Sequence, residues 1–313
     1  MEYINHNNHS ISKLTLGTVA LGLEYGISNN EGKPSLEQSD SIISAAISAG
    51  INMLDTAATY GNAEEIIGGY FVNHPNDSCR IVTKFTISNE NLISPEKAKA
   101  QVYASVKQSL KNLHTAKIYC VLYHKPEEQP MEKIIHVLRP IVEDLKNDGL
   151  IETAGISVFY PQEAASIIKE DFLQAVQLPI NIMDTRLCDN GNLNELKQYN
   201  KLVFARSIFL QGLFFMNPDD LKGNLVDAKP FLLKLKEIAQ QANLSVAELA
   251  FAYVRDLNGI SSLIFGATEK SQVKENVELL KIKKLDPAFI RQIQVQFSKI
   301  PAHILIPSFW KES

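Results

Sequence analysis

The stretch NMLDTAATYGNAEEIIGGYF, residues 52–71, opens with an apolar run that ends in an acid, Asp55, and places a phenol, Tyr60, five residues later. Short apolar runs of this kind alternate with longer amphipathic segments along the whole chain. That alternation is typical of successive βα units, which build a parallel sheet. We therefore interpret the run before Asp55 as a strand whose carboxyl end carries a carboxylate.

The chain contains eight such runs. They are LTLGTV (14–19), INMLDTA (51–57), RIVTKF (80–85), IYCVLYH (118–124), TAGISV (153–158), AVQLPIN (175–181), LVFARSI (202–208) and SSLIFGA (261–267). Because no proline-rich linker or break in composition divides the 313 residues, we predict an α/β fold in which residues 1–313 form one domain, a single (β/α)₈ TIM barrel. An open doubly wound sheet is the alternative fold.

Helical patterns fill the segments between the runs. One begins at Ser94 as N-cap with Pro95 in its first turn. Another ends at Gly149 in the left-handed conformation, and Pro140 within it predicts a kink. Two more helices are expected before the last strand, at about 229–242 and 245–257.

Composition and charge exclude several classes of protein. Hydrophobic residues make up 45% and charged residues 21%, which is typical of a globular chain with a large core. The net charge of -4, without a basic cluster, argues against nucleic acid as a partner. The sequence lacks a signal peptide and any apolar stretch near the ~20 residues of a membrane helix. We expect no membrane association and a cytoplasmic location.

The cysteines and the N-terminal histidines receive structural interpretations. Cys79, Cys120 and Cys188 are far apart and show no CxxC spacing, so we expect reduced packing residues. His6 and His9 lie in a polar, asparagine-rich segment, which we interpret as a frayed end. No metal site is predicted.

Polar residues at the strand ends indicate chemistry. Asp55, Lys84 and His124 end or nearly end three successive predicted strands, and a barrel brings neighbouring strand ends to one mouth. Singly, each has an ordinary explanation as a cap, a snorkelling cation or a strand-end partner. Together they differ, because a lysine inside the apolar run RIVTKF is costly unless it meets a carboxylate, and Asp55 is the available partner.

A Lys84–Asp55 pair beside a phenol would stabilise tyrosinate and lower the pKa of Tyr60 from about 10 toward the range of a working acid or base. His124 could then donate to a substrate oxygen as charge develops there. No GxSxG elbow and no basic-flanked cysteine supplies a nucleophile, so hydride from a nicotinamide fits best. Neither a GxGxxG nor a Walker motif is present.

With these residues in view, the chain resembles the aldo-keto reductase superfamily over essentially its whole length. The matching stretches are LDTAATYG (54–61), VTKF (82–85), LYHKP (122–126), GLIETAGISV (149–158), QLPIN (177–181), ARSIFLQGLF (205–214) and FGATEKSQVKEN (265–276). The resemblance implies an NADPH-dependent oxidoreductase with a catalytic tetrad of Asp55, Tyr60, Lys84 and His124. In it Tyr60 is the general acid, Lys84 and Asp55 tune it, and His124 orients the carbonyl.

The resemblance also implies a set of cofactor-binding residues. They are Gly17, Thr18, Asp55, Ser157, Gln177, Arg206, Ser207, Gly266, Gln272, Glu275 and Asn276. Ser157 and Gln177 are expected near the carboxamide, and the residues from Ser207 to Asn276 near the phosphates and adenine. Gln272 and Asn276 lie four residues apart on a predicted helix whose N-terminus suits a phosphate.

Three positions depart from the family pattern. Val158 follows Ser157 where many members have asparagine, and Arg206 stands where many have an aromatic residue that stacks on the nicotinamide. A guanidinium plane can stack as well; the alternative for Arg206 is a surface ion pair. The stretch FGATEKSQVKEN also lacks the Lys and Arg that several members place against the 2'-phosphate, and Lys270 is the remaining candidate. NADPH is still expected over NADH on family grounds.

The substrate is expected to be a small carbonyl compound. Lys125, where several members have tryptophan, suggests a polar or anionic molecule, unless its side chain faces solvent. Residues 15–34 and RSIFLQGLF (206–214) resemble a bacterial branch associated with sugar and polysaccharide metabolism, and Trp310 in the terminal IPSFW either closes the pocket or packs outside the barrel. Rival interpretations are a cofactor-binding regulatory or scaffold protein and a barrel lyase or isomerase. Oligomeric state, direction and physiological substrate stay open.

Overall fold

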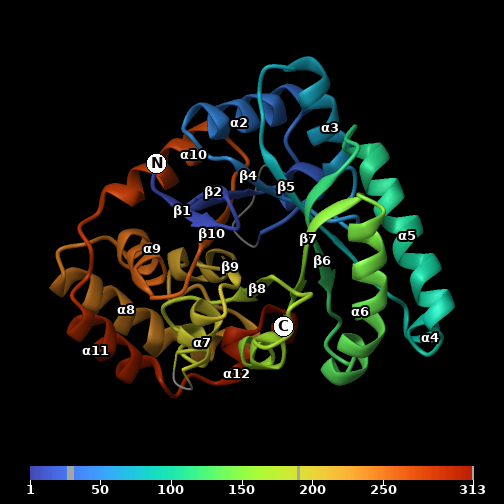
Figure 1. The fold of residues 1–313 in the computed structure, drawn as a ribbon. Coiled ribbons are helices and arrows are strands. Elements are labelled where there is room, and N and C mark those ends of the chain that lie inside the picture. Colours follow the sequence, from blue (N-terminus) through green and yellow to red (C-terminus); the bar gives the residue numbers. More distant parts are fainter. Residues whose placement is uncertain (27–31, 189–190, 312–313) are drawn as a thin grey trace.

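A closed barrel of parallel strands forms the centre of the computed structural model, which describes residues 1–26, 32–188 and 191–311 (Figure 1). Within these residues eight strands close the barrel in the order β10-β3-β4-β5-β6-β7-β8-β9. Their bounds are β3 (Leu14–Gly17), β4 (Met53–Asp55), β5 (Arg80–Phe85), β6 (Ile118–His124), β7 (Ile151–Ser157), β8 (Ala175–Pro179), β9 (Leu202–Arg206) and β10 (Ser262–Gly266). All eight predicted strands are confirmed.

The pairing of the last strand with the first closes the sheet. β10 pairs in parallel with β3, with Leu263 opposite Leu14 and Gly266 opposite Gly17. An open doubly wound sheet has no such pair, so the (β/α)₈ barrel holds and the alternative fold is excluded. A side chain at Gly17 would meet Ile264 Cγ2 at 2.9 Å and Phe265 O at 3.3 Å, which explains the glycine at this closing contact.

Helices surround the barrel (Figure 1). Their bounds are α1 (Val19–Gly22), α2 (Leu36–Ser48), α3 (Ala63–Asn73), α4 (Asn89–Leu92), α5 (Pro95–Asn112), α6 (Met131–Asn147), α7 (Asn192–Gln198), α8 (Lys229–Gln241), α9 (Val246–Asp256), α10 (Lys270–Glu278), α11 (Pro287–Phe297) and α12 (Ala302–Leu305). The predicted helices α5, α8 and α9 are confirmed. The Ser94 side chain caps α5 by accepting from Lys97 N.

The helix that ends near Gly149 is confirmed as α6, and Gly149 takes a φ of 72°. Pro140 lies inside this helix, and the kink there stays a prediction. No helix in the described part of the chain combines the length and the apolar character needed to span a membrane.

The N-terminus forms a hairpin of β1 (Tyr3–His6) and β2 (His9–Ser12), so the predicted frayed end is wrong. Asn7 and Asn8 turn the chain with φ of 46° and 68°, the left-handed conformation that tight hairpin turns need. His6 Nε2 bonds to Asn200 O at 2.9 Å, and His9 pairs with Glu152. The asparagine pair was the overlooked turn signal.

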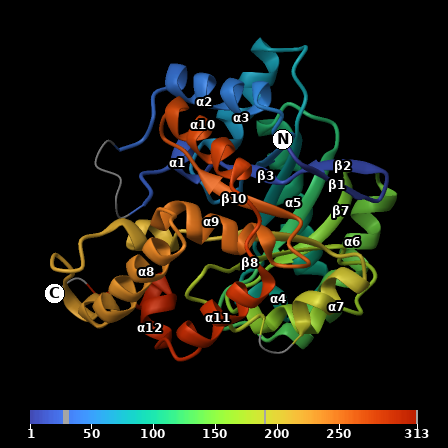
Figure 2. The ribbon, with the colours of Figure 1, turned by 90° about the vertical axis from the view of Figure 1, so that its left-hand side faces the viewer.

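This hairpin covers the amino-terminal end of the barrel. Ile11 of β2 packs inside the barrel against inward side chains such as Met53, Val82 and Leu202. Figure 2 shows the hairpin at one end of the barrel and α1, which follows β3, at the other. One end is therefore plugged, and the carboxyl ends of the strands form the mouth.

The three cysteines form no disulfide in the described part of the chain. Cys120 on β6 is fully buried inside the barrel, and burial raises the pKa of its thiol. Cys79 and Cys188 are partly buried and pack against the core. That the whole chain is one domain stays a prediction.

Candidate active site

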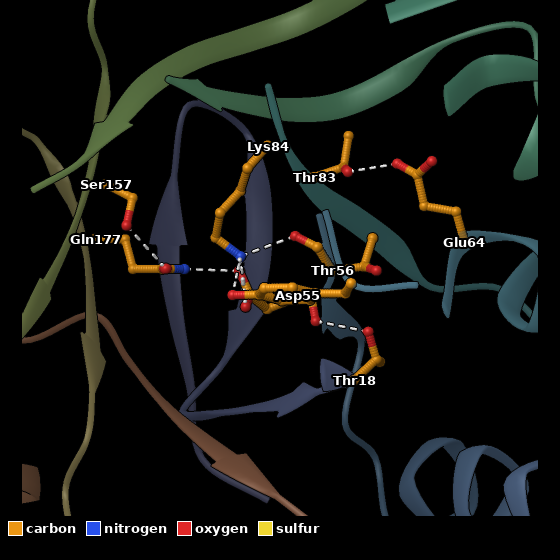
Figure 3. A network of polar contacts seen from close by, with 9 residues as sticks. Thr18, Asp55, Thr56, Glu64, Thr83, Lys84, Ser157 and Gln177 are labelled. Atoms are coloured by element: carbon orange, nitrogen blue, oxygen red, sulfur yellow. Dashed lines mark hydrogen bonds and ion pairs between the residues drawn. The ribbon is translucent and has the colours of Figure 1, made fainter. Parts of the chain in front are cut away.

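Polar side chains from successive strands meet at the barrel mouth (Figure 3). Parallel pairing sets Gly17 opposite Asp55, His124 opposite Ser157, and Ser157 opposite Gln177. In-register parallel strands bring their carboxyl ends to one level, so residues far apart in sequence become neighbours. Thr18 ties the first two strands together, because its N–H and its hydroxyl both donate to Asp55 O, at 2.9 and 3.0 Å.

The centre of the site is a buried ion pair between Lys84 and Asp55. Lys84 Nζ donates to both Asp55 carboxylate oxygens and to Thr56 O, each at 2.8 Å, and Lys84 is 1% exposed. Burial alone would lower the pKa of this amine, but the Asp55 and Tyr60 oxygens hold it above its ordinary value. The amine is therefore a fixed ammonium, as the sequence predicted.

The ammonium also faces Tyr60. Lys84 Nζ lies 3.4 Å from the Tyr60 hydroxyl and 4.7 Å from the centre of its ring. A cation this close stabilises negative charge on the phenol oxygen. The predicted contact between Asp55, Lys84 and Tyr60 is thus present.

Two glycines fix the backbone that carries Tyr60. A Cβ on Gly22 of α1 would lie 1.8 Å from Tyr60 O, and a Cβ on Gly61 would lie 2.4 Å from Gly22 O. Gly61 also has a φ of 56°. No other residue permits so close an approach, so α1 locks the loop between β4 and α3 in place. Spacing in the sequence did not reveal the role of Gly22.

His124 lies across from Tyr60. Their rings are 6.5 Å apart and perpendicular. Burial, reinforced by the positive charges of Lys84 and Arg206, lowers the pKa of His124 to about 4. The imidazole is therefore neutral near pH 7, and a neutral ring can donate one hydrogen bond to a ligand oxygen without adding charge.

A second chain of polar contacts, through Gln177, also reaches Asp55 (Figure 3). Ser157 Oγ donates to Gln177 Oε1 at 3.2 Å, and Gln177 Nε2 donates to Asp55 Oδ1 at 2.6 Å. The Asp55 carboxylate thus accepts hydrogen bonds from both the Lys84 ammonium and the Gln177 amide. No sequence pattern indicates the Gln177–Asp55 contact, because 122 residues separate the two.

These residues border a cavity of about 930 Å³, large enough for a dinucleotide and a small substrate. The predicted residues on its wall are Gly17, Thr18, Asp55, Tyr60, His124, Gln177, Arg206, Ser207, Gly266, Gln272, Glu275 and Asn276. Lys84 and Ser157 lie directly behind this wall, bonded to Tyr60 and Gln177. Tyr25, Phe159 and Phe215 also line it; the sequence analysis missed them, although Phe159 follows a predicted strand end by one residue.

Lys125 does not face the cavity. Its side chain is 1% exposed, and Nζ contacts Glu163 Oε1 at 2.9 Å and donates to Pro126 O and Glu127 O. Glu163 in turn accepts from the backbone N–H of Phe159. Lys125 therefore holds two loops together, and its ammonium is not available to a substrate. This corrects the predicted pocket role of Lys125.

Trp310 is also placed away from the cavity wall. Its ring packs against the outer core, and Nε1 donates to Ile304 O at 3.1 Å. Of the two predicted alternatives, packing outside the barrel describes the structure. The indole hydrogen bond fixes the terminal segment against α12.

Arg206 borders the cavity close to Tyr60. Its guanidinium donates to Val158 O at 3.1 Å and to Ser207 Oγ at 3.4 Å. Burial lowers the pKa of the guanidinium, against the pull of Tyr60, Tyr25 and Asp55. No carboxylate pairs with it in the described residues, so the surface ion pair considered from the sequence is absent.

The far part of the cavity also suits a dinucleotide. A Cβ added to Gly266 would meet no atom within 4 Å, so the backbone there is open to a ligand. Asn276 Oδ1 is buried and has no hydrogen-bond partner in the described part of the chain, so it is an acceptor that a ligand donor would satisfy. Both features fit a bound nicotinamide dinucleotide.

Comparisons with known proteins agree with this geometry. An oxidoreductase named YqkF from Bacillus subtilis (strain 168) is 26% identical over 300 residues, 91% of this chain and 92% of the relative. D-arabinose 1-dehydrogenase of Saccharomyces cerevisiae is 28% identical over 295 residues, 87% of this chain and 84% of the relative. The holo form of aldo-keto reductase AKR11C1 from Bacillus halodurans superposes with a TM-score of 0.74 at 22% identity, covering 94% of this chain and 96% of that one.

The family model described as "Aldo/keto reductase family" matches residues 13–295. This range begins just before β3 and ends within α11, so it contains the whole barrel and every strand of its mouth. The chain therefore belongs to the aldo/keto reductase family of NAD(P)H-dependent oxidoreductases.

Proposed function

We propose that this protein moves a hydride between a nicotinamide cofactor and the carbonyl carbon of a small polar aldehyde or ketone, with Tyr60 as the proton donor in reduction. One observation carries the proposal. Lys84 Nζ is held by both Asp55 oxygens at 2.8 Å and lies 3.4 Å from the Tyr60 hydroxyl.

A bound reduced nicotinamide would supply the hydride, and the residues of the chain would handle the proton and the charge. Tyr60 donates its hydroxyl proton to the carbonyl oxygen, and the phenolate left behind faces the Lys84 ammonium. Asp55 keeps that ammonium charged and in place. Water returns the proton to Tyr60 after the alcohol leaves, so the phenol is restored.

His124 binds the same carbonyl oxygen. Its pKa of about 4 keeps the ring neutral, so it contributes a hydrogen bond and orientation while Tyr60 supplies the proton. Such a fixed donor stabilises the negative charge that develops on the oxygen. Because the low pKa of His124 leaves its ring without an extra proton, Tyr60 alone donates the proton.

The residues that would hold the cofactor form two groups. Near the nicotinamide are Gln177, with Ser157 behind it, and Arg206, whose guanidinium plane would stack on the ring. Along the phosphates and adenosine are Gly17, Thr18, Ser207, Gly266, Gln272, Glu275 and Asn276. The resemblance favours NADPH, and the charges near α10 bear on that choice below.

The substrate class is proposed as a sugar or a similar polar carbonyl compound. D-arabinose 1-dehydrogenase is among the relatives, and Tyr25, Phe159 and Phe215 give the cavity aromatic faces on which a sugar ring can stack. Residues 15–34 carry the resemblance to a sugar-metabolising branch, and 27–31 of them lie outside the described residues. A cytoplasmic location stays a prediction.

The test is a panel of aldoses, keto-sugars, small polar aldehydes and aromatic aldehydes, followed by nicotinamide absorbance with NADH and with NADPH. The proposal expects the highest kcat/KM among the polar carbonyls. Turnover confined to aromatic aldehydes would refute the substrate class. Absence of any nicotinamide oxidation, with cofactor still bound, would favour the regulatory or scaffold interpretation.

A further inference from the structure

The cavity ends at α10, far along the chain from the residues that face Tyr60. This inference rests on the proposed function, which places the nicotinamide beside Tyr60 and hence the adenosine at the α10 end. The residues that line this end are Thr268, Glu269, Gln272, Glu275, Asn276 and Leu279. Their charges and hydrogen bonds decide whether an adenosine with a 2'-hydroxyl or one with a 2'-phosphate fits.

The charge of this end is negative. Glu269 and Glu275 both line the cavity, whereas Arg206, at the end of β9, is the one cation on its wall among the described residues. The segments 27–31, 189–190 and 312–313 contain no Lys or Arg in the sequence. A 2'-phosphate would therefore meet carboxylates without a neutralising partner, at a Coulombic cost.

Two hydrogen-bond donors just before α10 are already used. Thr268 N donates to Gln272 Oε1 at 2.8 Å, and the Thr268 hydroxyl donates to the same oxygen at 3.4 Å. A phosphate at a helix N-terminus needs such donors free. The Gln272 side chain thus competes with an anion for the two donors of Thr268.

This end also leaves hydrogen-bond acceptors free. Asn276 Nδ2 donates to Gln272 O at 2.8 Å, while Asn276 Oδ1 is buried and has no partner among the residues that the structure describes. The carboxylates of Glu269 and Glu275 are acceptors as well. A ribose with both hydroxyls and an adenine amino group offers matching donors, and a 2'-phosphate offers acceptors only.

We propose that the α10 end of the cavity selects a 2'-hydroxyl, so that this enzyme works with NADH in preference to NADPH. A carboxylate that accepts from a ribose 2'-hydroxyl is a general way to prefer NADH, and an arginine in its place favours the phosphate. Here Gln272 and two glutamates stand where a phosphate would need cations.

Lys270 is the cation that could still neutralise a 2'-phosphate at this end. It begins α10, is exposed, and is absent from the cavity wall. If its flexible side chain turned inward, it would offset the glutamates. The variant Lys270→Gln separates the two cases, and Lys274→Gln, an exposed lysine of the same helix, is its matched control.

The experiment measures dissociation constants for NADH and NADPH by calorimetry on the full chain. The proposal expects NADH to bind at least about tenfold more tightly, as expected for an uncompensated charge clash. Equal affinities, or tighter NADPH, would overturn it while leaving the proposed function intact. If neither cofactor binds, both fail. ADP-ribose and its 2'-phosphate serve as probes that omit the nicotinamide end.

The salt dependence of the NADH preference is an independent test. Between about 0.01 M and about 1 M salt the Debye length falls from about 30 Å to about 3 Å. Screening should shrink the NADH preference, because it weakens the repulsion of the 2'-phosphate. A cation holding that phosphate would give the opposite trend and overturn the proposal.

Variants complete the test. Gln272→Arg should free Thr268 and add a cation, which improves NADPH binding by about tenfold or more relative to NADH. Glu269→Gln should shift the ratio in the same direction by a smaller factor. Lys270→Gln should leave the ratio near that of Lys274→Gln; a selective loss of NADPH affinity in Lys270→Gln would contradict the proposal.

Discussion

The two ends of the barrel carry the same four kinds of side chain in different arrangements. At the mouth, Tyr60, Lys84, His124 and Asp55 meet around the cavity. At the plugged end, Arg80 lies 5.6 Å from the ring of Tyr119, His9 contacts both, and Glu152 pairs with His9. Lys84 and Arg80 even belong to one strand, β5.

The difference lies in which groups touch. At the mouth the carboxylate binds the lysine directly, and the lysine approaches the phenol oxygen at 3.4 Å. At the plugged end the carboxylate binds the histidine, the Tyr119 hydroxyl has no hydrogen-bond partner within the described ranges, and burial raises the pKa of that phenol. Residue types alone do not make an acid-base site; the order of contacts does.

The largest expected contrast comes from removing each phenol oxygen. Tyr60→Phe should lower kcat by about 10²–10⁴-fold, the usual worth of a positioned acid, with cofactor affinity unchanged. Tyr119→Phe should leave kcat unchanged and keep or raise stability, because it removes a buried hydroxyl without a partner. Steady-state kinetics and cofactor titration check both, and a similar kcat for the two variants would defeat the comparison.

Removing each cation should separate a buried ion pair, Lys84 with Asp55, from Arg80, which contacts His9 and the ring of Tyr119 and forms no ion pair among the described residues. Lys84→Met strands Asp55 as an unpaired buried charge and should cost about 3–5 kcal/mol of unfolding free energy. Arg80→Met should cost about 1 kcal/mol or less. Urea unfolding measures both.

The double variant Lys84→Met/Asp55→Leu sharpens this prediction. Stability should recover, since both charges are gone, while activity stays lost, since no cation faces Tyr60. Recovery of activity together with stability would show that the pair serves only the fold.

The position of Tyr60 depends on a close backbone contact with Gly22 at the mouth. Gly22→Ala places a methyl group 1.8 Å from Tyr60 O, so we expect a loss of about 1–3 kcal/mol from overpacking and a lower kcat. Gly69→Ala, in α3 with nothing within 4 Å, should instead gain about 0.5–1 kcal/mol. Chemical unfolding and kcat at saturating cofactor distinguish the two; an unchanged kcat in Gly22→Ala would contradict its role.

The pH dependence of stability should include a contribution from His124. Its pKa is about 4 in the folded protein and about 6.5 when unfolded. Between these values the unfolded chain binds more protons, so stability falls as pH drops from about 6.5 to about 4, by roughly 2–3 kcal/mol. His124→Gln should remove that part of the slope, and an unchanged slope would refute the shift.

The last prediction concerns unfolding, and it tests whether both ends of the barrel belong to one domain. Trp310 is the only tryptophan of the chain, and it packs on the core near α12. Its fluorescence and the far-UV circular dichroism should therefore change in one coincident transition. Two separate transitions would divide the chain into more than one unit.

Much of the fold could be predicted from the sequence, because parallel strands that are buried on both faces have continuous apolar sequences. The eight runs mark β3 to β10, and capping residues such as Ser94 mark helix starts. The hairpin was missed because its polar strands lack that signal. Asn7 and Asn8 were the only cue, and they resemble a loop.

The candidate site divides in the same way. Asp55, Tyr60, Lys84 and His124 could be named in advance, since an acid, a phenol, a lysine and a histidine at successive strand ends are unusual against apolar surroundings. Lys125 and Trp310 were misplaced, because sequence position does not say whether a side chain turns to the cavity or to Glu163 and Ile304.

The sequence by itself thus determined the barrel and the chemical groups at its mouth, because hydrophobic periodicity and residue type are local properties. Only the tertiary structure decided the contacts between distant residues: Gln177 with Asp55, Gly22 against Tyr60, and Gln272 folded onto Thr268. Such contacts depend on strand register and on backbone approach within a few ångströms, which no local pattern encodes.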